Sequence, residues 1–343
     1  MSDLLMKSLT QRIIHLLYRY ESLTVYQIWI LTGYARKTIE KHVSDMTKEG
    51  LIKRLRIPMI EQRSTAFHLT PETAEWAGTC VRERRLFRAK QWDGPPGSIV
   101  QLLIGNQYVT ELIRATQNDE NNGVYEWLGR VGAADMYTRY EEDKKIPGPD
   151  YNSYVVFHYE GKKYIFHLDI ISGNESFAAI EELFIDFQKS VIESNQWSDL
   201  ESVNYQLICY GKEMREKLLK LWYGVAGKRS VPFLSVANYQ DIATQGVFAP
   251  VWMTAEKGMV SLRDLPSLNT VDNVSEFMSK ERPDPAGSGE NAVLPGFQGF
   301  FSPESEEQPS EPIQSSDKKE ENTEKEESVD SSDDVGIAWT IPK

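Results

Sequence analysis

Residues 25–69 read VYQIWILTGYARKTIEKHVSDMTKEGLIKRLRIPMIEQRSTAFHL, and this stretch decides the fold of the first part of the chain. A short apolar helix is followed by a turn at Gly33 and then by a second helix rich in Arg and Lys. That helix is expected to end at Gly50, because glycine tolerates the left-handed conformation of a helix C-cap. Two strand-like runs, Leu51–Ile57 and Ser64–Leu69, flank a polar loop. This order of elements predicts a winged helix-turn-helix.

The second helix of this stretch has one apolar face and one polar face. Ile39, Val43 and Met46 recur at helical spacing and are expected to face the core. The side chains left pointing outward suit the major groove of DNA: Arg36, Lys37, Thr38, Lys41 and His42. Arg56 and Arg63 lie where a wing would meet phosphate groups. These seven side chains are the predicted contacts with double-stranded DNA.

The charge of the first part of the chain contrasts with that of the whole. Residues 1–92 hold 16 Lys and Arg against 9 Asp and Glu, whereas the complete chain has a formal net charge of −13. A locally basic unit within an acidic protein is typical of a phosphate-binding surface. Two other interpretations stay open. A basic helical hairpin can be only a solvated surface, and some winged helices are protein-docking modules.

Length and composition indicate a globular protein of the cytoplasm. With 343 residues, 40% of them hydrophobic, the chain is long enough for two domains that each bury a core. Cys80 and Cys209 lie far apart without a second cysteine or paired histidines at metal-ligand spacing, so reduced and buried thiols are expected. Polar residues interrupt the first apolar segment, and no run reaches the ~20 apolar residues of a membrane helix. These features predict neither a signal peptide nor a membrane span.

The run Asp93-Gly94-Pro95-Pro96-Gly97 divides the chain, which predicts a winged unit over residues 1–92 and a second unit over residues 98–265. Helices and strands alternate in the second unit, so a mixed sheet covered by helices is expected. The predicted fold class is therefore α+β with several domains. Helices are predicted over residues 71–88, 98–117, 175–193 and 212–222, and strands over residues 125–128, 151–159, 163–171, 205–210 and 231–237.

The last part of the chain, residues 266–343, is predicted to be a disordered acidic tail. Residues 303–334 contain 13 Asp and Glu against 3 Lys and no aromatic residue, which is too little apolar area to offset the entropy of ordering. Two apolar islands, residues 292–301 and 336–343, could bind a partner protein or could be plain linker residues. The tail could also fold back on the basic winged face and compete with DNA.

The second unit resembles the core of a restriction-endonuclease-like fold. In active members of that fold, two or three carboxylates bind Mg or Mn while a lysine positions the attacking water. Asp150 matches the first acid, and Asp169 and Glu126 are the other candidates for a metal site. The expected lysine is missing, because Ile171 stands two residues after Asp169. The resemblance therefore implies a scaffold without catalysis and without a required cofactor.

Several short segments occur in a characteristic order after the winged N-terminus. These are Glu126-Trp127, Pro149-Asp150, IFHLDIISGNES at residues 165–176 and SVANYQDIATQGVFAPVW at residues 235–252. Their order resembles the replication-relaxation family of bacterial plasmids and integrative elements, over about residues 5–255. The family pattern carries Glu-x-Asp and then Arg-Gly-Thr. This chain has His167-Leu168-Asp169 followed by Ile170, so the first acid is missing.

The resemblance implies a DNA-binding accessory protein in the replication, relaxation or conjugative transfer of a plasmid or mobile element. The winged unit would bind DNA as a homodimer, and the tail would recruit a replication or transfer protein. One alternative is a metal-dependent nickase or nuclease that uses Glu126, Asp150 and Asp169. Another is a transcription regulator whose second domain senses a ligand.

Overall fold

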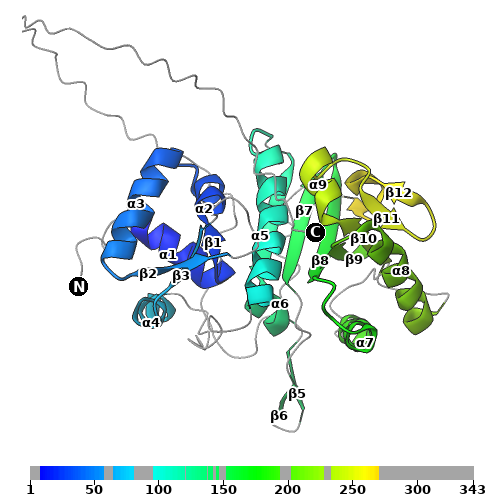
Figure 1. Cartoon of the computed structure of the whole chain (residues 1–343). Helices are drawn as coiled ribbons and strands as arrows, with labels where there is room; N and C mark the ends of the chain where they lie inside the picture. The colour runs from blue at the N-terminus through cyan, green and yellow to red at the C-terminus, as the bar shows by residue number, and fades with distance from the viewer. Residues whose placement is uncertain are drawn as a thin grey trace, which may run out of the picture.

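The computed structural model shows a mixed α/β protein with two sheets of more than two strands (Figure 1). It describes residues 8–57, 65–80, 96–119, 121–136, 138–141, 144–146, 152–193, 202–227 and 233–269. The predictions for Arg63, for Asp150, for the end of the 71–88 helix and for the acidic tail after residue 269 fall outside these residues. In the described part, no helix is both long and apolar enough to cross a membrane.

The N-terminal unit combines four helices with a small antiparallel sheet in the described residues. Its strands lie in the order β1-β3-β2, and Ile52 of β2 pairs with Leu69 of β3. The predicted turn at Gly33 and the two predicted strands are present. The elements are α1 (Ser8–Tyr20), β1 (Leu23–Thr24), α2 (Val25–Thr32), α3 (Arg36–Lys48), β2 (Ile52–Arg56), β3 (Thr65–Leu69) and α4 (Pro71–Cys80).

Helix α3 ends as its sequence predicts. Gly50 adopts a left-handed φ of 72°, and its N–H donates to the carbonyl of Thr47. The N–H of Leu51 reaches back to the carbonyl of Met46, which completes the pair of bonds typical of a glycine-terminated helix. Ile39, Val43 and Met46 are buried. The apolar face of α3 and its C-terminus are therefore both explained by local sequence.

The second unit begins with a long helix and continues as strands with helical crossovers. The predicted helices and strands are present with ends that shift by a few residues. The elements are α5 (Pro96–Thr116), β4 (Gly123–Gly129), α6 (Arg130–Met136), β5 (Arg139–Glu141), β6 (Lys144–Ile146), β7 (Ser153–Tyr159), β8 (Lys162–Ile171), α7 (Phe177–Glu193), β9 (Val203–Cys209), α8 (Lys212–Ala226), β10 (Phe233–Asn238), α9 (Tyr239–Gln245), β11 (Trp252–Thr254), β12 (Gly258–Val260), a 3₁₀ turn (Leu262–Asp264) and β13 (Leu268–Asn269).

Eight of the described strands form the large sheet. Seven follow the order β12-β11-β10-β9-β8-β7-β4, and β13 pairs with the start of β8. Strands β8, β9 and β10 are parallel, while the neighbours on both sides are antiparallel. Helices α7 and α8 supply the crossovers and cover one face. Helix α5 covers the opposite face (Figure 1).

Two parts of the second unit depart from the sequence prediction. Helix α9 and the β11–β12 hairpin occupy the region after residue 238, where no helix or strand was predicted. Strand β13 shows that the sheet continues past residue 266, the predicted start of the tail. Strands of two or three residues and a helix of seven residues carry too few residues for a periodic signal, so neither departure was predicted from the sequence.

The two units share one continuous core, although the sequence predicts separate domains. Buried residues of α1, α2 and α3 belong to the same apolar cluster as those of α5 and of the sheet face beneath it. Figure 1 shows α5 between the N-terminal unit and the large sheet. Helix α5 therefore packs on both units at once, and their relative position is set by buried contacts.

Hydrogen bonds and an aromatic stack hold this junction. The Asn106 side-chain amide of α5 donates to the carbonyls of Tyr20 and Ser22, at 3.1 and 3.0 Å. Gln27 of α2 donates to the carbonyl of Leu103, at 3.0 Å. The rings of Tyr20 and Trp127 stack with centroids 3.7 Å apart. The side-chain N–H groups of Asn106 and Gln27 are thus paired across the junction.

Trp127→Ala is expected to lower the free energy of unfolding by about 3–5 kcal/mol, because it leaves a cavity where a buried indole stacks on Tyr20. Urea-induced unfolding measures the loss. Tyr223→Ala on α8 is the matched control, since this aromatic side chain is 36% exposed and its removal should cost little. Equal losses in the two variants would contradict the role given to Trp127.

Candidate nucleic-acid interface

Helix α3 presents a basic stripe to solvent. Arg36, Lys37, Thr38 and Lys41 are exposed, as the sequence predicts. With a rotation of 100° per residue, Lys37, Lys41 and Lys48 lie on the side of α3 opposite its buried side chains, and these three lysines make up the basic stripe. Lys48 was not among the predicted contacts. Its spacing of seven residues from Lys41 is the signal that would have identified it.

Acidic neighbours partly offset this stripe at its two ends. The Arg36 guanidinium lies 3.0 Å from the Glu40 carboxylate, and Lys48 lies 3.5 Å from Asp45. All four side chains are largely exposed, so these pairs contribute little to stability and can be exchanged for phosphate contacts. Lys37 and Lys41 lie between Arg36 and Lys48 along the helix.

His42 differs from its prediction as an outward-pointing DNA contact. Its side chain is half-buried, and Nε2 lies 2.7 Å from the Thr10 hydroxyl of α1. The ring thus bridges α1 and α3. The reason for the difference is that α1 packs beside this edge of α3, a contact that the spacing within α3 does not reveal.

Strand β2 adds three exposed basic residues: Lys53, Arg54 and Arg56. Only Arg56 was predicted as a contact. Arg54 lies over the ring of Phe67, with its guanidinium carbon 5.9 Å from the ring centroid. Side chains alternate along a strand, so Arg54 shares a face with Arg56 and could have been predicted from that spacing, whereas Lys53 points to the other face. Figure 1 shows α3 at the outer edge of the N-terminal unit, on the side away from α5 and the sheet.

The register of the sheet separates two of the proposed metal-binding acids. Glu126 on β4 pairs with Val156, which pairs with Ile165 on β8, four residues before Asp169. Two strand spacings and four residues of rise place Glu126 and Asp169 about 16 Å apart. This distance separates the Cα atoms. Carboxylate oxygens of Asp and Glu extend about 4–5 Å from Cα, and the ligand oxygens of one Mg or Mn ion lie within about 5 Å of each other, so these two acids do not share an ion. Across the residues that the structure describes, no three His, Cys, Asp or Glu side chains group as metal ligands.

Asp169 lies at the carboxyl end of β8 and is partly exposed. Its carboxylate accepts a hydrogen bond from the N–H of Ile170 at 2.8 Å and from the hydroxyl of Tyr205 at 3.4 Å. Burial, followed by the charge of Asp169 and this hydrogen bond, raises the pKa of Tyr205 well above its ordinary value. Tyr205 is consequently a neutral donor that orients Asp169.

His167 is a core residue. Its ring lies between Tyr154 and Phe187, with centroid distances of 5.3 and 4.9 Å. Burial lowers the pKa of His167 to about 3, so the imidazole is neutral at physiological pH. His167 is therefore a neutral group packed against aromatic rings.

The one cysteine side chain that the structure describes, Cys209, is a buried free thiol, as expected. Burial raises the pKa of Cys209 to about 12, so the thiolate needed for nucleophilic attack is not formed at neutral pH.

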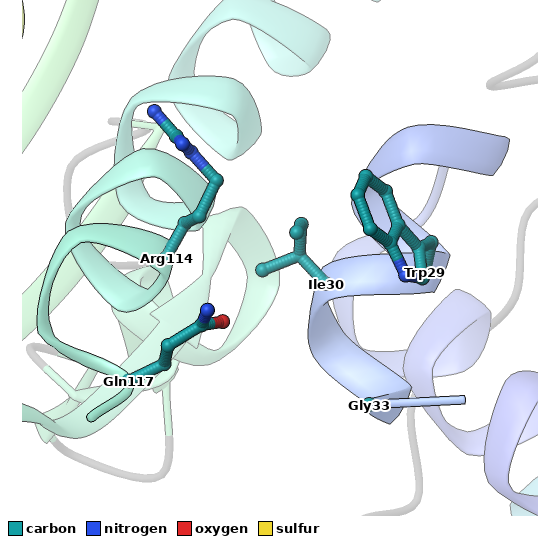
Figure 2. Close-up of a pocket in the computed structure, with 5 residues that line it drawn as sticks. All are labelled: Trp29, Ile30, Gly33, Arg114 and Gln117. Atoms are coloured by element: carbon teal, nitrogen blue, oxygen red, sulfur yellow. The ribbon is translucent and has the colours of Figure 1, made fainter. Parts of the chain in front are cut away.

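A half-open pocket of about 320 Å³ lies between α2 and α5 (Figure 2). Its lining combines apolar and polar side chains: Trp29, Ile30, Gly33, Arg114 and Gln117. None of these is a carboxylate, histidine or cysteine, so the lining offers no acid, base or nucleophile.

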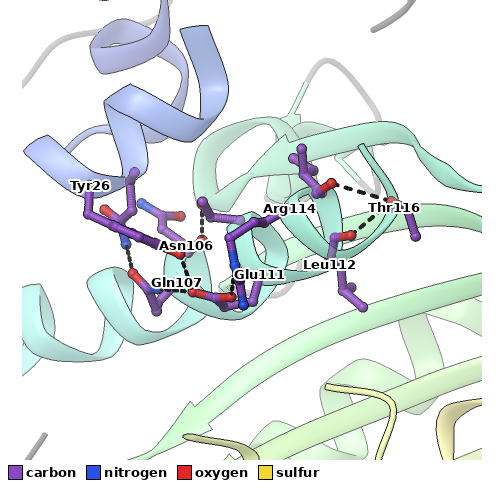
Figure 3. Close-up of polar contacts among 10 residues, drawn as sticks. Tyr26, Asn106, Gln107, Glu111, Leu112, Arg114 and Thr116 are labelled. Atoms are coloured by element: carbon purple, nitrogen blue, oxygen red, sulfur yellow. Dashed lines mark hydrogen bonds and ion pairs between the residues drawn. The ribbon is translucent and has the colours of Figure 1, made fainter. Parts of the chain in front are cut away.

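The charge of Arg114 beside this pocket is already paired. Figure 3 shows Glu111 accepting hydrogen bonds from Tyr26, Gln107 and Arg114, at 2.8, 2.8 and 2.7 Å. Burial and then the bond to Glu111 raise the pKa of Tyr26. This network ties α2 to α5 and reinforces the junction between the two units.

Comparison with protein-family models, curated proteins and solved structures finds no match for this chain. The geometry described above therefore carries the functional argument.

The lowered pKa of His167 predicts that the folded protein loses stability in acid. Its pKa is lower in the folded protein than the ordinary value of 6.5, so between pH 6.5 and 3 the unfolded chain binds more protons. Stability is lost as the pH falls through this window. Between pH 7 and pH 5, wild type should lose about 2 kcal/mol more unfolding free energy than His167→Phe. Urea titrations at the two pH values test this, and parallel losses would contradict it.

Proposed function

We propose that the N-terminal unit is a winged helix-turn-helix that binds double-stranded DNA through α3. The order α1-β1-α2-α3-β2-β3 and the strand order β1-β3-β2 support this interpretation. The observation that carries the proposal is the exposed basic stripe of Lys37, Lys41 and Lys48 on a helix whose opposite face is buried. A helix of this kind fits the major groove, where its side chains reach base edges.

The basic residues divide into two roles in this proposal. Lys37 and Lys41 enter the groove together with Thr38, whose hydroxyl can bond to a base or to phosphate. Arg54 and Arg56, which share one face of β2, contact the phosphate backbone beside the groove. A pair of winged units on two half-sites would increase selectivity, so a homodimer is part of the proposal.

The second unit is proposed to be a nuclease-like scaffold. The order α5-β4-β7-β8-α7-β9, interrupted between β4 and β7 by α6, β5 and β6, and the mixed sheet support this interpretation. The buried neutral His167 and the lack of lysine two residues after Asp169 argue against phosphodiester cleavage. With the resemblance to replication-relaxation proteins, these features favour an accessory role in plasmid or mobile-element replication, relaxation or transfer, with a partner bound through the acidic tail.

Replacing both Lys37 and Lys41 by Ala is expected to weaken binding to a fluorescein-labelled duplex. Two phosphate-neutralising charges are removed, so the slope of log K against log[salt] should fall in magnitude by about 2. Fluorescence anisotropy between 50 and 200 mM salt, two concentrations that bracket the steep range, measures both effects.

The matched control for this pair is Lys217→Ala with Lys220→Ala on α8. Both lysines are exposed and lie on the far side of the large sheet from α5. The control should bind DNA like wild type. An unchanged affinity and salt slope in the α3 variant would refute the assignment of α3, and an absence of any DNA binding would favour a protein-docking module.

Supercoiled plasmid incubated with the protein and Mg²⁺ or Mn²⁺ should stay supercoiled, because β8 lacks the lysine that would activate water. Agarose gel electrophoresis separates the supercoiled, nicked and linear forms. Metal-dependent nicking that both Asp150→Ala and Asp169→Ala abolish would instead establish the nickase alternative.

A further inference from the structure

Polar side chains gather in the core between α5 and the large sheet, away from the basic stripe and from Asp169. Four of them are buried, with exposed fractions of 3% or less: Tyr108, Gln206, Ser235 and Trp252. All four are uncharged. A cluster of this composition is unusual for a core face, which is otherwise lined by apolar residues such as Leu168, Ile170 and Ile208.

The sheet register brings these side chains together. Gln206 on β9 pairs directly with Ser235 on β10, so both point to the same face. Ala237, two residues further along β10, pairs with Trp252 on β11, and the indole therefore lies on that face as well. Tyr108 reaches down from α5, with its ring centroid 5.5 Å from that of Trp252 in an edge-on contact. Three strands and one helix thus contribute side chains to one cluster on this face of the sheet.

The polar atoms of this cluster have no hydrogen-bond partners among the described residues. They are the Tyr108 hydroxyl, both polar atoms of the Gln206 amide, the Ser235 hydroxyl and the Trp252 indole N–H. Burial raises the pKa of Tyr108 and the nearby Gln206 opposes that rise, yet no bond of ordinary length and angle joins the two groups. Buried polar groups in proteins are nearly always paired with protein or with ordered water.

We propose that ordered water molecules occupy a buried site formed by Tyr108, Gln206, Ser235 and Trp252. A buried water typically makes about three hydrogen bonds, and this cluster offers both donors and acceptors around one position. Because the four side chains carry no charge, the site has no group to neutralise an ion, and water is the neutral ligand that can both donate and accept.

The site has a consequence for the position of α5. Apolar packing is not directional, so it leaves a helix free to slide or rotate by small amounts on a sheet. Water-bridged hydrogen bonds from Tyr108 to β9, β10 and β11 are directional. They fix the orientation of α5, and α5 in turn carries the N-terminal unit on its other side.

Substitution by an apolar residue of similar size distinguishes polar atoms that bond to water from polar atoms that have no hydrogen-bond partner. Gln206→Met keeps the volume but removes two polar atoms, and Ser235→Ala removes a single hydroxyl. If water bridges these groups, each substitution leaves the bridging water short of partners and should lower the Tm of the full-length protein by about 2–4 °C. The control is Thr110→Val on α5, whose hydroxyl bonds only within its own helix, to the carbonyl of Asn106. Its Tm should change less.

A Tm equal to or above that of wild type in both Gln206→Met and Ser235→Ala would overturn the proposal, because removing truly unsatisfied atoms stabilises a core. A crystal structure of the full chain gives an independent readout. Separate water peaks within hydrogen-bonding distance of at least three of the four side chains support the site. Continuous density of an organic molecule, or side chains that repack to bond directly to one another, would also overturn it.

Discussion

The packing of α5 against both neighbours is the constraint on which the rest of the structure depends. Asn106 holds the carbonyls of Tyr20 and Ser22, which flank Glu21. Glu21 has a φ of 62°, a conformation that a residue with a side chain adopts at a cost. The side-chain amide of Asn106 donates hydrogen bonds to the two backbone carbonyls of this bend, which lies between α1 and β1. The bend directs α2 against α5, so the N-terminal unit and the sheet share one core.

This arrangement places the basic surface of α3 apart from the junction between the two units. The basic stripe of α3 lies on the side of the N-terminal unit away from α5, and the hydrogen-bond network around Glu111 joins α2 to α5 where Glu111 is partly buried and Arg114 is exposed (Figures 1 and 3). A ligand on α3 therefore meets a rigid helix whose position relative to the sheet is set by buried contacts. Shared apolar packing makes the two units respond together to destabilisation, in contrast to domains joined by a linker alone.

The same packing sets the charge state of side chains within the large sheet. Strands β8 and β9 are covered on both faces, so a side chain such as His167 is placed among aromatic rings and loses its charge. Asp169 is not enclosed in this way, because it lies near the carboxyl end of β8, where it is partly exposed. The neutral Tyr205 beside it orients the carboxylate but supplies no positive charge.

Local sequence determined much of the secondary structure. The 3–4 residue spacing of Ile39, Val43 and Met46 specified the buried face of α3, and Gly50 specified its end, because both depend on neighbours within one helical turn. Tertiary structure alone decided the rest. Asn106 bonds to a carbonyl 86 residues away, the sheet register separates Glu126 from Asp169, and α1 covers His42. Contacts between residues so far apart leave no periodic trace in the sequence, since they depend on how completed elements pack.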